Sequence, residues 1–213
     1  EQNGGTAEIL TANLCDLNQT EALAEKIKNI DVLVLNASLQ YRTPWQEISA
    51  EACYEQLNCN FVSSLVLMQQ YANHMKTQKW GRIVTIGSVQ EAKPHPDMLI
   101  YSASKAAQTN MVHSLSLQLA SFGITVNNVA PGVIYTDRNV EALSDEEYAK
   151  KVTALIPVGF SANAIGGAGG PMAVYIVAII ACELGKVVSK ETRIDILVTP
   201  IVTILVGIGL SGI

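Results

Sequence analysis

The chain has 213 residues, of which 49% are apolar and 15% charged, and its formal net charge is −5 at pH 7. This length fits one ordinary domain, or one domain with an appendage. A net negative charge and the lack of a lysine or arginine run argue against a nucleic acid as partner.

The cysteines argue against a metal site. Cys15, Cys53, Cys59 and Cys182 show neither a CxxC pair nor a cysteine–histidine spacing that could bind a metal ion. We therefore expect reduced cysteines that pack as small apolar side chains, in a protein of the cytoplasm.

Strand-like and helix-like patterns alternate as far as Val129. Strands are predicted at Ala7–Leu14, Asp31–Leu35, Arg82–Ile86 and Ile124–Val129. Helices are predicted from Asn18 to about Lys28, from the N-cap Ser49 onwards, and from Tyr101 to Ala120. The helix after Ser49 is expected to bury one apolar face, made of Ala52, Leu57, Phe61, Leu65, Met68 and Ala72.

Strands separated by helices predict βαβ units. The fold class that follows is α/β, with a Rossmann-like, doubly wound parallel sheet and helices on both faces. Ligands of such sheets bind beyond the carboxyl ends of the strands. The candidate functional residues follow a strand or lie on the adjoining helix, which indicates an enzyme.

Three residues form the central candidate site: Ser88, Tyr101 and Lys105. Tyr101 and Lys105 stand on the same face of a predicted helix, one turn apart. A phenol, with a pKa of about 10, is a poor acid–base group at neutral pH, but a nearby cation favours its phenolate. Ser88 can bond the substrate oxygen with which Tyr101 exchanges a proton while a hydride moves at the carbon. The alternative is a surface helix whose tyrosine and lysine merely pair along their stems.

The region 7–158 resembles the classical short-chain dehydrogenases/reductases in its motifs and in their order. The resemblance rests on Ser88 with Tyr101-Ser-Ala-Ser-Lys105, on Leu35-Asn36-Ala37-Ser38 after a strand, and on the turn Pro131-Gly132-Val133. It implies an oxidoreductase that transfers a hydride between NADP or NAD and a small carbonyl or alcohol substrate. It also implies that Asn60 is a fourth catalytic residue, which holds a water that links the lysine to solvent; Asn58 fits the helical register less well.

The same resemblance assigns a cofactor site. Asp16, followed by Leu17, corresponds to the acidic residue that contacts the adenine ring, and Thr136 contacts the carboxamide or the phosphate. The cofactor-binding residues implied are Asp16, Leu17, Asn36, Ala37, Ser38, Tyr101, Lys105, Pro131, Gly132, Val133 and Thr136. Family members commonly associate through two long helices, so a homo-oligomer is expected.

Both ends of the chain depart from the family pattern. The Thr-Gly-xxx-Gly-x-Gly turn that cradles the pyrophosphate, and the residue that selects NAD or NADP, have no counterpart before Ala7. We therefore interpret residues 1–159 as a truncated Rossmann-like domain. Weak cofactor binding and reduced or lost activity are predicted, because several charge-assisted hydrogen bonds would be missing.

The composition changes at about Phe160. A glycine-rich linker, 160–170, precedes a hydrophobic helical hairpin at 171–213, whose arms could enter a membrane because about 20 helical residues span a bilayer. From about Ile165 this segment is similar to the membrane (IIC) component of sugar phosphotransferase systems, notably in Gly169-Gly-Pro-Met-Ala-Val and Asp195-Ile-Leu-Val-Thr-Pro200. A chimeric reading frame is one interpretation. A membrane or transport protein and a non-catalytic fragment are the alternatives to an oxidoreductase.

Overall fold

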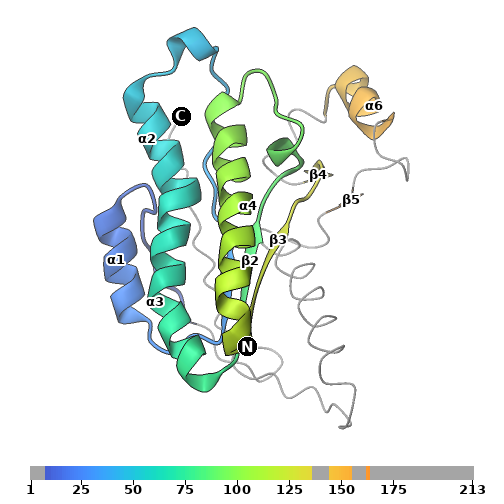
Figure 1. Ribbon diagram of the computed structural model, residues 1–213. Helices are drawn as coiled ribbons and strands as arrows, with labels where there is room; N and C mark the ends of the chain where they lie inside the picture. The colour runs from blue at the N-terminus through green and yellow to red at the C-terminus, as the bar shows by residue number, and fades with distance from the viewer. Residues whose placement is uncertain (1–7, 136–143, 155–161, 164–213) are drawn as a thin grey trace. The chain divides into compact units, whose positions relative to one another are not determined.

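The computed structural model describes residues 8–135, 144–154 and 162–163 (Figure 1). These residues fall into two compact units. The first unit ends at Pro131 and contains the sheet that bears the predicted site. The second begins at Gly132 and contains β4 (Ile134–Tyr135), α6 (Glu146–Ala154) and β5 (Ala162–Asn163), with β4 parallel to β5.

A three-stranded parallel sheet is the centre of the first unit. Its strands β1 (Val32–Leu35), β2 (Gly81–Ile86) and β3 (Ile124–Val129) lie in the order β1-β2-β3. Ile83 of β2 stands opposite Leu33 of β1 and Val126 of β3. β1 is buried at every position, as expected for a strand inside an α/β fold. The predicted class, a Rossmann-like α/β fold with a parallel sheet, is confirmed.

The described helices of this unit cover one face of the sheet, and the predicted helices on the other face stay a prediction. The described helices are α1 (Leu17–Lys26), α2 (Ala50–Leu57), α3 (Ser63–Gln78) and α4 (Leu99–Leu119), with 3-10 turns η1 (Trp45–Glu47), η3 (Val89–Glu91) and η4 (Ala120–Phe122). A π-helical turn, η2 (Asn58–Val62), joins α2 to α3. Figure 1 shows α1, α3 and α4 side by side against the strands. Ser49 caps α2 as predicted, because its Oγ accepts the backbone N–H of Ala52 at 3.1 Å.

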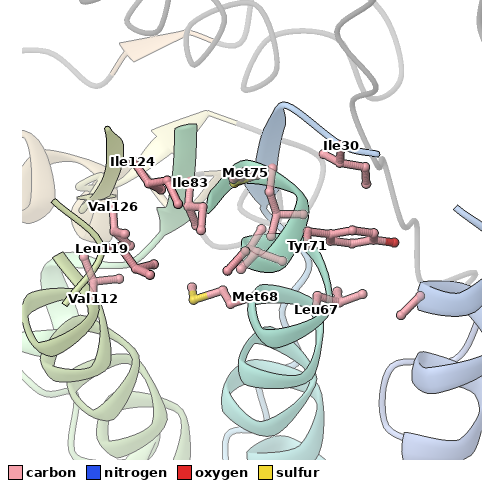
Figure 2. Close-up of a cluster of buried hydrophobic side chains, with 14 residues drawn as sticks. Ile30, Leu67, Met68, Tyr71, Met75, Ile83, Val112, Leu119, Ile124 and Val126 are labelled. Atoms are coloured by element: carbon pink, nitrogen blue, oxygen red, sulfur yellow. The ribbon is translucent and has the colours of Figure 1, made fainter. Parts of the chain in front are cut away.

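The core lies between the sheet and α3 and α4 (Figure 2). Leu67, Met68, Tyr71 and Met75 form the buried stripe of α3, at the spacing of one helix face. The strands contribute Leu33, Leu35, Ile83, Ile124 and Val126, and α4 contributes Val112 and Leu119. This packing holds α4 against β2 and β3, and so determines where the side chains of α4 lie relative to the strand ends.

The segment Ala7–Leu14, predicted as a strand, does not form one in its described part. It makes no ladder with β1, which is the edge strand of the described sheet. Ala12 and Leu14 are nevertheless buried, in a cluster with Leu23 of α1. The apolar residues of this segment therefore indicate burial, and burial alone does not require strand pairing.

The buried face of the long helix also differs from the prediction. Met68 and Ala72 are buried as expected, but Leu57, Phe61 and Leu65 are only partly buried. Polar residues share the buried face instead: Gln56, Asn60, Ser63 and Ser64. The prediction assumed that the buried face is made of apolar residues, whereas this face also carries polar side chains that form hydrogen bonds to other elements.

Among the described helices none is both long and apolar enough to cross a bilayer. The hairpin predicted at 171–213 lies outside the described residues, as does the linker 160–170 apart from Ala162 and Asn163.

Gly123 is a position at which the backbone requires glycine. Its φ is +73°, and a Cβ there would lie 2.2 Å from the carbonyl oxygen of Lys79. We expect Gly123→Ala to lower the free energy of unfolding by about 2–4 kcal/mol, because backbone atoms must move. Urea denaturation followed by circular dichroism measures this change.

Lys79→Gly is the matched control for that substitution. Lys79 ends α3 with a φ of 56°, a conformation in which glycine is less strained than lysine. We expect this variant to be as stable as the wild type or up to ~1 kcal/mol more stable. A comparable loss in both variants would show that the turn is sensitive to any change, rather than to a Cβ at residue 123.

Candidate active site

The side chain of Lys105 is buried at the carboxyl end of the central strand. It is 1% exposed, and its Nζ donates to the carbonyl oxygen of Ile86 at 2.7 Å and to Oε1 of Gln108 at 3.2 Å. Ile86 is the last residue of β2, so the ammonium group lies at the edge of the sheet where ligands bind in α/β folds. Lysine is almost never buried so completely unless it is paired. The alternative of a solvated surface pair is therefore wrong.

Tyr101 stands one turn before Lys105 on α4. Its side chain is 7% exposed, and Nζ of Lys105 lies 5.9 Å from the centroid of its ring. The helix thus brings the predicted pair together.

Ser88 follows β2 and caps the turn η3. Its Oγ accepts the backbone N–H of Gln90 at 3.2 Å, so its own hydroxyl proton can be donated to another oxygen. Ser102 of α4 donates to Oε1 of Gln90 at 2.8 Å and fastens η3 to the helix that carries Tyr101. Ser88, like Lys105, therefore belongs to the carboxyl end of β2.

Asn60 lies in the π-helical turn and is fully buried. Its Oδ1 accepts the N–H of Leu39 at 2.7 Å, while its Nδ2 donates to the carbonyl oxygen of Leu39 at 2.8 Å and to Oγ of Ser104 at 3.0 Å. The amide thus joins the loop after β1 to the face of α4 that carries the predicted site. Asn58 is partly exposed and donates instead to the carbonyl oxygen of Cys15 at 3.3 Å.

Two buried residues beside Lys105 were missed by the sequence analysis. Gln108 accepts from the lysine and donates through Nε2 to Oγ of Ser64 at 2.9 Å. Ser64 donates in turn to the carbonyl oxygen of Asn60 at 3.4 Å. A glutamine three residues after the lysine, and so on the same helical face, was the available signal.

A polar cluster around Glu91 was missed as well. Its carboxylate accepts from the N–H of Ser88 at 3.4 Å, from Oγ1 of Thr109 at 2.8 Å and from Nδ2 of Asn128 at 3.0 Å. A Cβ at residue 87 would lie 2.5 Å from Oε2 of Glu91, so the Glu91 side chain would have to shift to make room for one. The available signal was the Ser-x-x-Glu spacing, which is typical of a capping box.

A small pocket lies at the carboxyl end of β1. It is lined in part by Leu35, Asn36 and Ala37 of the strand end and by Cys59 and Ser63 of η2 and α3. Two of the predicted cofactor residues therefore line a pocket at the expected edge of the sheet. Ser38, the next predicted residue, is partly buried.

Asp16 has a local function as the N-cap of α1. Its Oδ1 accepts the backbone N–H groups of Asn18 at 3.0 Å and Gln19 at 3.4 Å, and its Oδ2 accepts from Nε2 of Gln19 at 3.1 Å. The helix consequently begins at Leu17 and not at the predicted Asn18. The adenine contact assigned to Asp16 and Leu17 stays a prediction.

The remaining predicted cofactor residues divide at the boundary between the two units. Pro131 ends the first unit, and its carbonyl oxygen accepts the N–H of Val89 in η3 at 2.9 Å. Gly132 and Val133 begin the second unit, and Thr136 lies outside the described residues. In the part of the chain that the structure describes, no group of histidine, cysteine or acidic residues could hold a metal ion.

Comparison with known proteins identifies the family. Residues 1–147 match the family model of the short chain dehydrogenases, so the chain belongs to that family. A 3-oxoacyl-[acyl-carrier-protein] reductase of Rickettsia bellii is 34% identical over 152 residues, which cover 70% of this chain and 62% of that protein. The crystal structure of a 3-oxoacyl (acyl-carrier-protein) reductase from Agrobacterium tumefaciens C58 with NADP bound gives a TM-score of 0.71 at 32% identity, covering 76% of this chain and 65% of that one. The chain thus spans less than two thirds of the length of these two proteins.

A third relative bears on the end of the chain. The 3-oxoacyl-[acyl-carrier-protein] reductase of Escherichia coli (strain K12) is 32% identical over 193 residues, which cover 89% of this chain and 76% of that protein. A match of that length necessarily includes part of 165–213. These relatives therefore give no support to the predicted similarity with a phosphotransferase membrane component, or to a chimera.

Proposed function

We propose that this chain is an oxidoreductase that transfers a hydride between NADP or NAD and a carbonyl–alcohol pair, with Tyr101 as its acid–base group. The observation that carries the proposal is the buried ammonium group of Lys105, 5.9 Å from the Tyr101 ring. Membership of the family, and relatives that are named as reductases, support the same type of reaction.

Each of the four proposed catalytic residues has its own role when the carbonyl is reduced. Ser88 donates a hydrogen bond to the carbonyl oxygen of the substrate. Tyr101 gives its proton to that oxygen while the carbonyl carbon receives a hydride, and the product is an alcohol. Lys105 stabilises the phenolate that remains. Asn60 fixes the loop after β1 through its bonds to Leu39 and, as the resemblance implies, holds the water that returns the proton.

Asn36 and Ala37 follow β1 and line a small pocket there, at the edge of the sheet where ligands of α/β folds bind, which supports a nicotinamide cofactor at this edge. When bound, the cofactor supplies or accepts the hydride. We propose that the residues that hold it are Asp16, Leu17, Asn36, Ala37, Ser38, Tyr101, Lys105, Pro131, Gly132, Val133 and Thr136. A relative was crystallised with NADP, which makes NADP the first cofactor to test.

Turnover by the purified chain tests the proposed reaction. The absorbance of the reduced nicotinamide is followed with NADPH and with NADH, at cofactor concentrations up to the millimolar range. The substrates are a panel of ketones that includes 3-oxoacyl thioesters, because the three relatives described above are named as 3-oxoacyl reductases. We expect oxidation of the cofactor that depends on a ketone. No turnover on the whole panel, combined with no cofactor binding, would indicate a non-catalytic fragment.

Calorimetric titration with NADP and NAD tests the separate prediction of weak cofactor binding. A dissociation constant in the micromolar range would show that prediction to be wrong and leave the proposed reaction intact. A chain that stays in solution only with detergent would favour the membrane alternative. Homo-oligomerisation and a cytoplasmic location stay predictions, and the first is measured by light scattering in the same samples.

A further inference from the structure

Gln108 links the ammonium group of Lys105 to the neighbouring helix. Its Oε1 accepts from Nζ of Lys105 at 3.2 Å, and its Nε2 donates to Oγ of Ser64 on α3 at 2.9 Å. Ser64 donates to the carbonyl oxygen of Asn60 at 3.4 Å. Each of these four residues is at most 4% exposed. They form one buried polar network that crosses from α4 to α3 and η2.

The directions of the hydrogen bonds determine how the Gln108 amide is turned. Because Ser64 gives its single hydroxyl proton to Asn60, its oxygen can only accept from Gln108. If the amide were reversed, its NH2 group would face the ammonium group of Lys105, and two buried donors would oppose each other. The network therefore holds the carbonyl end of Gln108 toward the lysine.

We propose that Gln108 is a positioning residue that fixes the Lys105 ammonium group beside Tyr101, and that Ser64 orients Gln108. The inference rests on the proposed function, in which that ammonium group stabilises the Tyr101 phenolate. Gln108 and Ile86 both offer neutral oxygens, so they hold the ammonium group without cancelling its charge. A carboxylate at residue 108 would bond the lysine equally well and oppose the charge that Tyr101 requires.

Other ionisable groups surround α4 and are common to all variants. On α4 and on the elements packed against it they include Cys59, Glu91, Tyr101 and His113, with Glu51, Cys53, Tyr54 and Glu55 on α2 and Arg82 on β2. Glu91 is bonded to Thr109, and Glu55 to the Tyr41 hydroxyl at 2.6 Å. Because these groups are unchanged, a difference between the wild type and a residue-108 variant reports on residue 108.

The titration of Lys105 tests the inference without any need for turnover. In protein labelled with 13C-lysine, the Cε resonance of Lys105 gives the pH midpoint at which the ammonium group loses its proton. We expect Gln108→Leu to lower this midpoint by about one pH unit, because a charged donor loses an acceptor. Gln108→Glu should raise it. Gln118→Leu, at an exposed glutamine of the same helix, is the matched control and should leave it unchanged.

Kinetics separate positioning from a merely structural role. We expect Gln108→Leu to lower kcat by about 10- to 100-fold with a change in KM below about threefold, because the displaced group acts in the chemical step. Gln108→Glu should move the pH of half-maximal alcohol oxidation upward by about one unit. Ser64→Ala, which leaves Gln108 in place but frees its amide to turn, should cost about three- to tenfold in kcat.

The outcomes separate this inference from the proposed function. An unchanged Lys105 midpoint in both residue-108 variants overturns the inference, whatever their activity. Turnover that needs Tyr101 but is unaffected in Gln108→Leu overturns it as well and leaves the reaction standing. A shifted midpoint in a chain without turnover supports the contact and rejects the reaction. If circular dichroism shows that Gln108→Leu does not fold, the same Lys105 titration and kinetics on Gln108→Glu and Ser64→Ala test the inference instead.

Discussion

Tyr101→Phe is expected to lower kcat/KM about a thousandfold, with the fold intact and cofactor binding changed by less than about tenfold. The substitution removes a single oxygen atom from a side chain that is 7% exposed on α4. Proton transfer by a positioned side chain contributes about 10²–10⁴ to a rate, and the proposed reaction assigns that transfer to this hydroxyl. Ser88 and Lys105 remain in the variant, so binding of the substrate oxygen should persist while its protonation is lost.

Steady-state kinetics in both directions, with cofactor titration by fluorescence, measures these quantities. Tyr54→Phe is the matched control, because Tyr54 is a 66% exposed tyrosine of α2 and should tolerate the same change without effect. A Tyr101→Phe variant that kept more than about a tenth of the wild-type kcat/KM would show that another group delivers the proton.

The parts of the fold that follow from local patterns could be predicted. Strand-like patterns predicted β1, β2 and β3 to within one residue, and helical spacing predicted α4 with Tyr101 and Lys105 on one face. Such signals depend only on near neighbours in the chain. The pairing of lysine with tyrosine was predictable for the same reason, because a helix brings residues four apart together by itself.

The contacts that hold the site together could not be predicted in this way. Asn60 reaches Leu39 and Ser104, and Gln108 reaches Ser64, across separations of 21 to 44 residues. No periodicity indicates which polar residue will find such a partner. A count of apolar residues therefore predicted only part of the buried face of the long helix: Met68 and Ala72 are buried, but so is Gln56, which is polar and hydrogen-bonded.

The predicted strand Ala7–Leu14 is a different kind of error, because here an element was predicted that the structure does not form. Ala12 and Leu14 are buried, as in a strand of the core, but a strand also needs a partner along its edge. Asp16, which the resemblance assigns to the cofactor, also caps the start of α1 with both carboxylate oxygens, and this local function was not predicted. A local capping function and a ligand contact look the same in the sequence, since both place an acidic residue after an apolar run.

Lys105→Met is expected to lower kcat by about 10²–10⁴-fold and, unlike Tyr101→Phe, to weaken cofactor binding about tenfold as well. The resemblance assigns both Lys105 and Tyr101 to catalysis and to cofactor binding, but Lys105→Met removes a charged hydrogen-bond donor, whereas Tyr101→Phe removes a neutral hydroxyl. Stability should change little, because removing a charge from a site that is 1% exposed relieves the cost of burying it and so offsets the loss of bonds to Ile86 and Gln108. Denaturation in urea, with kinetics and cofactor titration on the same samples, measures all three quantities. Lys28→Met, at an exposed lysine, is the matched control.

The pH dependence of Lys105→Met distinguishes an electrostatic function of the lysine from simple packing. Without the ammonium group the phenolate of Tyr101 loses its stabilising charge, so the pH of half-maximal alcohol oxidation should rise by about one unit or more. Methionine fills a similar volume, so a packing function would be preserved and this profile would not move. Lys105→Arg keeps the charge but carries a larger planar group into a site closed by Gln108, and we expect it to fold less stably without restoring the rate. A methionine variant with both wild-type kcat and the wild-type pH profile would mean that the phenol works without a neighbouring cation, and the mechanism proposed for this site would be wrong.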